Sequence, residues 1–206
     1  MTTLRKFSAA VAVSTVALAT VIPAAAVSAA VSYSCRADTK FGRHHLSLRQ
    51  GATAAAPATV RPGAHFYVVV DLKPGSLPSE VKGFKLQEVR DLSLRLPVPR
   101  NAQYVSAWLS RGSGLGSKPT IEVRHGVATL RVAGPIRGGA AYHLPQLTVH
   151  LKAGRSGVVE TRLSGSSHDN PGLTLQATIK WKFVTVKSPV DCYPDPNPAL
   201  TRTQIR

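Results

Sequence analysis

Acidic residues are scarce in this chain of 206 residues, which contains 10 Asp and Glu against 26 Lys and Arg and carries a formal net charge of +16. Glycoside hydrolysis needs two carboxyl groups that face one bond. Glu88 and Asp91 would point to opposite faces of one strand, because side chains alternate along a strand. The scarcity of acids therefore argues against a glycosidase.

Motifs of catalysis and metal binding are also missing. The chain has no G-x-S-x-G, H-x-H or H-E-x-x-H pattern, and His44 and His45 are adjacent, as at a solvated strand start. Segment 164–169, SGSSHD, holds all three residue types of a serine-hydrolase triad, but triad residues normally converge from separate segments. We interpret it as a turn and predict no metal and no cofactor. An extracellular enzyme that uses His168, Asp169 and a serine is the alternative.

A nucleotide-binding loop is absent as well. The stretch 111–120, RGSGLGSKPT, has three alternate glycines, but position 117 is serine and the G-x-G-x-x-G spacing fails. A strand pattern follows at 120–123, where a phosphate loop requires a helix N-terminus. We predict a flexible connection between two β-strands. Basic residues are scattered with no run of more than two, which argues against a nucleic-acid partner.

Long hydrophobic runs are confined to the N-terminus. Residues 1–30 have a basic pair at 5–6, an apolar run over 7–22 and then small residues, which is typical of a secretory signal peptide. The run is shorter than the roughly 20 residues of a membrane helix. Cleavage fits after Ala26 or Ala30, and we favour Ala30. The mature chain would carry a charge of +14, because the leader holds two basic residues and no acid.

The chain has two cysteines, Cys35 and Cys192. An exported protein meets an oxidising compartment, so we predict that they form a disulfide, with free or intermolecular thiols as the alternative. In the chain-entropy model such a long loop contributes at most about 5 kcal/mol. Prolines alternate at 194–198, and proline lacks the amide donor of a central strand. We therefore predict one domain over 31–192 and a proline-rich tail, 193–206, that extends along the surface.

In the rest of the sequence, apolar and polar residues alternate with a period of two in short segments that are separated by Gly and Pro. In 173–183 alternate positions are apolar, and the other face carries Lys180 and Lys182. A slip after Phe183 predicts a bulge, and His125-Gly126 predicts a hairpin turn. Strand patterns occur at 44–50, 65–72, 91–98, 103–110, 120–125, 127–133, 147–152, 157–164 and 173–183.

Strands with one apolar face each need a second sheet to cover them. The sequence therefore predicts an all-β fold, a single-domain antiparallel immunoglobulin-like β-sandwich, with a β-barrel as the alternative.

Exposed aromatic and basic residues are the candidates for binding. If Val105, Ala107 and Leu109 face the core, then Tyr104 and Trp108 face outward, where aromatic rings stack on ligands. A neighbouring loop that covers them, or a register reversed by one residue, is the alternative. The alternation at 147–152 also exposes His150, and Lys180 and Lys182 complete the set of candidate binding residues.

Several short segments resemble those of small secreted actinobacterial proteins of unknown function, some of which carry the labels cyclase or dehydratase. The segments are VSYSC at 31–35, PVP at 97–99, GSGLGS at 112–117, DNPGLT at 169–174 and CYPDPNPALT at 192–201. The resemblance implies export and a disulfide-closed β-fold. None of these segments is catalytic.

Export, positive charge and the lack of catalytic motifs together predict a secreted, non-enzymatic protein that is extracellular or loosely associated with the cell wall. A basic surface attracts polyanions at low salt. We expect the partner to be an anionic cell-wall polymer, a lipid surface or another protein.

Overall fold

The computed structural model describes residues 24–40 and 42–206, and all of the regular structure in these residues is β-strand. The longer strands are β1 (Ala24–Thr39), β2 (Gly42–Pro57), β4 (His65–Leu72), β7 (Phe84–Pro97), β8 (Ala102–Ser110), β9 (Thr120–Arg124), β10 (Val127–Val132), β13 (Gln146–Ala153), β14 (Gly157–Thr161), β15 (Leu173–Trp181), β16 (Val184–Pro194) and β17 (Thr201–Ile205). The short strands are β3 (Thr59–Val60), β5 (Gly75–Ser76), β6 (Glu80–Val81), β11 (Ile136–Arg137) and β12 (Ala141–Tyr142). The prediction of an all-β fold is confirmed.

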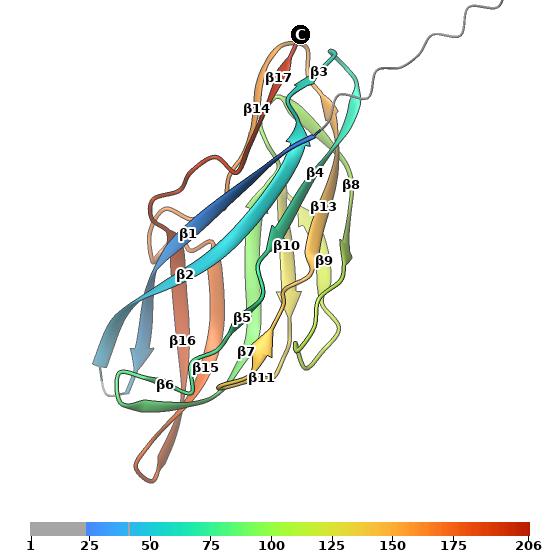
Figure 1. Cartoon of the computed structure of the whole chain (residues 1–206). Coiled ribbons are helices and arrows are strands. Elements are labelled where there is room, and N and C mark those ends of the chain that lie inside the picture. Colours follow the sequence, from blue (N-terminus) through green and yellow to red (C-terminus); the bar gives the residue numbers. More distant parts are fainter. Residues whose placement is uncertain (1–23, 41) are drawn as a thin grey trace, which may run out of the picture.

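One antiparallel sheet forms most of the molecule, with the strand order β8-β13-β4-β2-β1-β16-β15-β7-β10-β9 (Figure 1). Its two outer strands, β8 and β9, follow each other in the chain, so the sheet is nearly closed and barrel-like. Of the two architectures predicted, the barrel therefore describes this sheet well. A small sheet, β14-β17-β3, lies at the end of the molecule where the chain terminates, and its β17–β3 pair is parallel.

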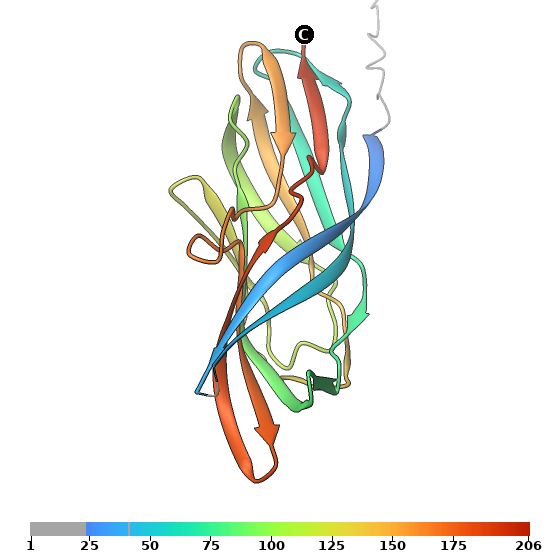
Figure 2. The same ribbon diagram turned by 90° about the vertical axis from the view of Figure 1, so that its left-hand side faces the viewer.

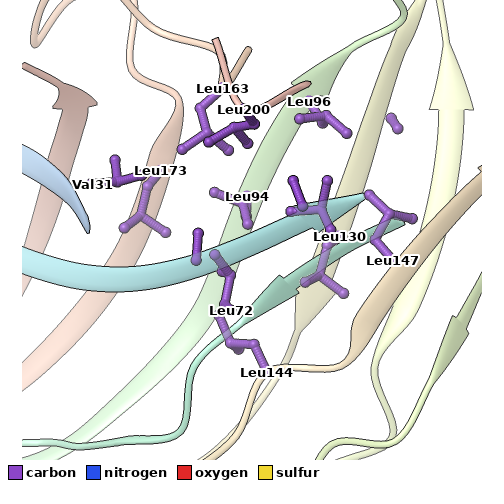
Figure 3. Packing of buried hydrophobic residues seen from close by; sticks show 14 of the residues in the cluster. Val31, Leu72, Leu94, Leu96, Leu130, Leu144, Leu147, Leu163, Leu173 and Leu200 are labelled. Atoms are coloured by element: carbon purple, nitrogen blue, oxygen red, sulfur yellow. The ribbon is translucent and has the colours of Figure 1, made fainter. Parts of the chain in front are cut away.

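The core lies inside this curved sheet because alternate residues of each strand point inward. In β1 the buried side chains are Val31, Tyr33, Cys35 and Ala37, at every second position. Figure 3 shows leucines from several strands meeting in one interior, among them Leu94 of β7, Leu130 of β10 and Leu147 of β13. Burial of apolar surface at about 25 cal/mol per Å² is the main term that holds such a sheet closed.

The predicted disulfide is present between Cys35 and Cys192. The two residues are direct register partners on β1 and β16, and their Cα atoms lie 4.1 Å apart. The bridge therefore ties the first long strand to the last strand of the main sheet.

The C-terminal segment corrects the expectation that the fold ends at Cys192. Strand β16 continues to Pro194, and β17 pairs with β14 and β3. Leu200 and Ile205 are buried, with exposed fractions of 2% and 3%. The alternate prolines only delay the next strand until residue 201, because proline lacks an amide donor but does not prevent the chain from pairing farther on.

The predicted leader, residues 1–30, lies outside the described residues as far as position 23. Its last seven residues, 24–30, belong to β1, where they pair with Gly51–Pro57 of β2. Removal of the whole leader would therefore shorten β1 to a strand that begins at Val31.

Candidate functional site

The turn between β15 and β16 projects beyond the rest of the sheet in both views (Figures 1 and 2). Trp181 pairs with Val184, so the turn itself has two residues, Lys182 and Phe183. Lys182 takes a left-handed conformation with φ of +54°, as tight hairpin turns require. The predicted bulge after Phe183 is therefore wrong, since the slip in alternation is a chain reversal.

We call residues 180–187 the hairpin tip. The strand alternation predicted Trp181 and Phe183 on the dry face, but β15 runs past the core at this point. Phe183 is 99% exposed and Trp181 is 41% exposed, and Val184 is exposed as well. The Lys182 Nζ lies 4.9 Å from the centroid of the Trp181 ring. The ring centroids of Trp181 and Phe84 lie 6.2 Å apart. Three large apolar side chains within four residues of chain, Trp181, Phe183 and Val184, are therefore exposed to water.

The hairpin tip is also strongly basic. It carries Lys180, Lys182 and Lys187, all exposed, and no acid. On the neighbouring strand, Lys85 is the register partner of Lys180, so a fourth amine is added from β7. A segment that exposes Phe and Trp side chains together with several lysines matches the boundary between anionic lipid headgroups and acyl chains.

A second exposed cluster lies on β4, β13 and β8, which pair side by side. Tyr67 is 50% exposed, and its ring centroid lies 5.8 Å from Trp108 and 4.6 Å from His150. His65 Nδ1 lies 3.1 Å from His150 Nε2. We call these four residues the aromatic patch. The sequence pointed to Trp108 and His150 but missed Tyr67 and His65, because only the pairing of β4 with β13 brings them together.

The strand that carries Tyr104 and Trp108, both predicted to face outward, has a register shift against β13 between His150 and Leu151. Trp108 lies opposite Thr148, whereas Tyr104 lies opposite Leu151, a core residue. Both aromatic residues are nevertheless exposed. Val105, which we expected in the core, is 43% exposed, since the bulge breaks the alternation there.

The residues of the alternative enzymatic site do not form a triad in the described structure. Asp169 accepts a hydrogen bond from Arg36 at 3.1 Å. His168 instead lies 3.5 Å from the Ser34 hydroxyl and stacks edge-on against His45 and Tyr193.

A histidine–acid pair that the sequence did not suggest lies elsewhere. His143 Nε2 is 3.1 Å from Asp71 Oδ1, and both side chains are about one-fifth exposed. His143 also exchanges two backbone hydrogen bonds with Ser113 of the glycine-rich connection. The pair thus links the connection 111–119 to β4. The connection is packed against its neighbours, whereas we had expected it to be flexible, and Leu115 within it is buried.

Two surface carboxyl groups are shifted by arginines. A hydrogen bond from Arg43 holds the pKa of Asp38 below its usual value, and one from Arg162 does the same for the pKa of Glu160. Arg202 adds to the second effect. Among the described residues, no group of three or more His, Cys, Asp or Glu side chains is placed to hold a metal ion.

No protein-family model matches the sequence, and no curated protein matches it. The structure is similar to a crystal structure of a "Putative membrane anchored protein" from Corynebacterium diphtheriae, with a TM-score of 0.59 and 16% identity. The match covers 87% of this chain but only 38% of that protein. At this identity the likeness shows a common fold. Within residues 24–40 and 42–206, the structure contains no helix of the length and apolarity needed to span a bilayer.

Proposed function

We propose that this protein is a secreted, non-enzymatic binding protein of the bacterial envelope, and that it docks on anionic membrane lipid through the hairpin tip. The observation that carries the proposal is the fully exposed Phe183 on the hairpin tip, a segment with three lysines and no acid. The disulfide supports an extracytoplasmic location, because such bonds persist in oxidising compartments. The structural neighbour described as membrane anchored is consistent with an envelope protein.

The energetics favour a surface contact of moderate strength. Transfer of a Phe side chain from water to an apolar environment gains about 1.5–3 kcal/mol. Each lysine close to an anionic leaflet adds about 1 kcal/mol, and salt screens this part. Trp181 is suited to the interface because a tryptophan side chain combines a large apolar ring with a polar N–H group. Insertion of the tip therefore combines an apolar contribution that resists salt with an ionic one that does not.

Flotation with lipid vesicles tests the proposal. We expect the protein to float with vesicles of phosphatidylcholine and phosphatidylglycerol, and to do so less as salt is raised. It should remain in the bottom fraction with vesicles of phosphatidylcholine alone. The Phe183→Ser variant should lose at least roughly tenfold in vesicle affinity, the factor that corresponds to about 1.5 kcal/mol, the lower end of the transfer energy of one buried Phe.

Tyr67→Ser is the matched control, because Tyr67 is also an exposed aromatic residue but lies in the aromatic patch. It should float like the wild type. If the wild type fails to float with anionic vesicles even at low salt, or if both variants behave alike, the hairpin tip is not a lipid-docking site.

The aromatic patch favours a second candidate function, binding of a cell-wall glycan. Tyr67, Trp108 and His150 present neighbouring rings on a sheet face, and such rings stack on sugars. Sedimentation with isolated cell walls tests this function. We expect Trp108→Ala to pellet less than the wild type while Phe183→Ser is unchanged. Equal pelleting of all three proteins would exclude the patch as a glycan site.

A further inference from the structure

A cavity of about 310 Å³ opens at the same end of the barrel as the hairpin tip. Its walls come from β1, β2, β6, β7, β15 and β16, and they include both cysteines of the disulfide. The lining is apolar almost throughout, with residues such as Leu46, Phe84 and Ile179. A smaller cavity of about 50 Å³ lies next to it and shares Leu48, Val89 and Leu175. The two cavities thus adjoin along shared apolar side chains.

A space of this size is a costly feature for a protein of this length. Protein interiors pack as densely as organic crystals, and voids larger than one water molecule are few. Small-molecule sites begin at roughly 300 Å³ and are lined mainly by apolar side chains with a few polar groups. With a volume of about 310 Å³ and an apolar lining, the cavity has the size and the character of a small-molecule site.

Two buried polar atoms on these walls have no hydrogen-bond partner within the described chain. His44 Nε2 belongs to the wall of the larger cavity, and the Tyr33 hydroxyl belongs to that of the smaller one. A buried polar atom without a partner costs free energy, so native structures leave very few of them. In the tautomer that carries the proton on Nε2, His44 is therefore available to donate a hydrogen bond to a ligand inside the cavity.

The mouth also carries charge. Lys82 and Glu80 both belong to the lining, and Glu80 lies opposite Lys85 in the β6–β7 register. The lining thus carries one lysine and one acid, and Lys82 is the cation that an anionic head group can meet there. An amphiphile with one apolar chain and one anionic group matches this distribution.

We infer that this cavity binds the acyl chain of a long-chain fatty acid, with the carboxylate at the mouth where it accepts a hydrogen bond from His44 and faces Lys82. The chain lies along the apolar walls and is shielded from water. This binding goes beyond the proposed membrane docking, because it needs no bilayer.

Titration of the full-length protein with free fatty acids of increasing length, from octanoate to palmitate, tests the inference. Calorimetry below the critical micelle concentration and native mass spectrometry should show a 1:1 complex. The affinity should rise about fourfold for each added CH₂, the equivalent of about 0.8 kcal/mol, and then level off when the cavity is filled. An affinity that does not depend on chain length, or the absence of a 1:1 complex, would overturn the inference.

Variants locate the site. Ala177 lines the cavity, so the larger ring of Ala177→Phe should fill the cavity and abolish binding. Near-UV circular dichroism checks that this variant is folded. His44→Phe keeps a ring but removes the donor, and we expect about tenfold weaker binding. His45→Phe is the matched control on the same strand, since His45 stacks on His168 and is not among the lining residues. Equal affinity of the His44 and His45 variants would contradict the assigned head-group contact.

Phe183→Ser should bind fatty acid normally, so failure of membrane docking and failure of this site can be told apart.

Discussion

Gly114 lies in the connection between β8 and β9, where the backbone of a second segment approaches it closely. Its φ is +67°, and a Cβ added here would collide with the carbonyl oxygen of Ala141. Gly126, in the turn between β9 and β10, has a similar φ of +73° but nothing within 4 Å of an added Cβ. Substitution of Gly126 therefore tests backbone strain alone, whereas substitution of Gly114 tests strain together with steric collision.

We predict that Gly126→Ala costs about 1–2 kcal/mol of unfolding free energy, from the left-handed conformation alone. Gly114→Ala should cost about 1–3 kcal/mol more, because a packed neighbour must move. Urea denaturation of both variants measures the difference. Equal losses would mean that the connection is loose, as the sequence suggested.

Glu160 gives a prediction for pH. Its pKa is lowered from 4.5 by Arg162 and Arg202, so its contribution to stability is present above about pH 4.5 and is lost as the pH falls through the folded-state value. In Glu160→Gln this part of the pH dependence disappears. We expect the unfolding free energy of the variant to fall less steeply than that of the wild type below pH 4.5. Identical profiles by chemical denaturation would show that the arginine contacts do not persist in solution.

At the scale of elements, β17 tests how the chain end contributes to the fold. Leu200 is 2% exposed and packs into the core immediately before β17 (Figure 3). Leu200→Ala should cost about 2–5 kcal/mol, the usual range for a buried Leu. Arg206→Ala, at the exposed end of the chain, should change stability by less than about 0.5 kcal/mol. A small effect at Leu200 would indicate that residues 193–206 lie outside the cooperative unit after all.

The strands that the sequence predicted well are those that alternate and end at a turn residue. The range 65–72 matches β4, and 103–110 and 147–152 fall within β8 and β13. Strand β16 was missed because the turn before it contains Lys and Phe in place of Gly or Asn, so the slip in alternation was interpreted as a bulge. Strand β17 was missed because prolines precede it.

The candidate site was less predictable for a different reason. Lys180, Lys182 and Trp108 could be found from local alternation, but Tyr67 and His44 depend on which strands become neighbours. Sheet order is a property of the whole chain and does not appear in any local pattern. The exposure of Phe183 likewise depends on where the core ends, which the spacing of residues in β15 does not reveal.

For the whole molecule, the disulfide is the one covalent link that spans most of the chain, with a sequence separation of 157 residues. The Cys35→Ala, Cys192→Ala double variant should lose up to about 5 kcal/mol of unfolding free energy, if the bridge acts on the entropy of the unfolded chain. Mass spectrometry under non-reducing conditions should show an intact mass two hydrogens below the reduced value. Two free thiols in freshly secreted protein would contradict the structure.

The hairpin tip and the cavity lie at one end of the barrel, and the small sheet β14-β17-β3 lies at the other (Figures 1 and 2). In the proposed docking, the lysine-rich hairpin tip faces the lipid and the small sheet points away from it. It follows that docking would bring the cavity mouth to the membrane surface.

The fluorescence of Trp181 tests the docking claim most directly. The sequence contains two tryptophans, Trp108 and Trp181, so Trp108→Phe leaves Trp181 as the sole reporter at the hairpin tip. Vesicles that contain phosphatidylglycerol should shift its emission to the blue, because the ring leaves water, and quenchers attached to the upper acyl chain should reduce its intensity. Vesicles of phosphatidylcholine alone should leave the spectrum unchanged. An unshifted, unquenched emission with anionic vesicles at low salt would contradict the account.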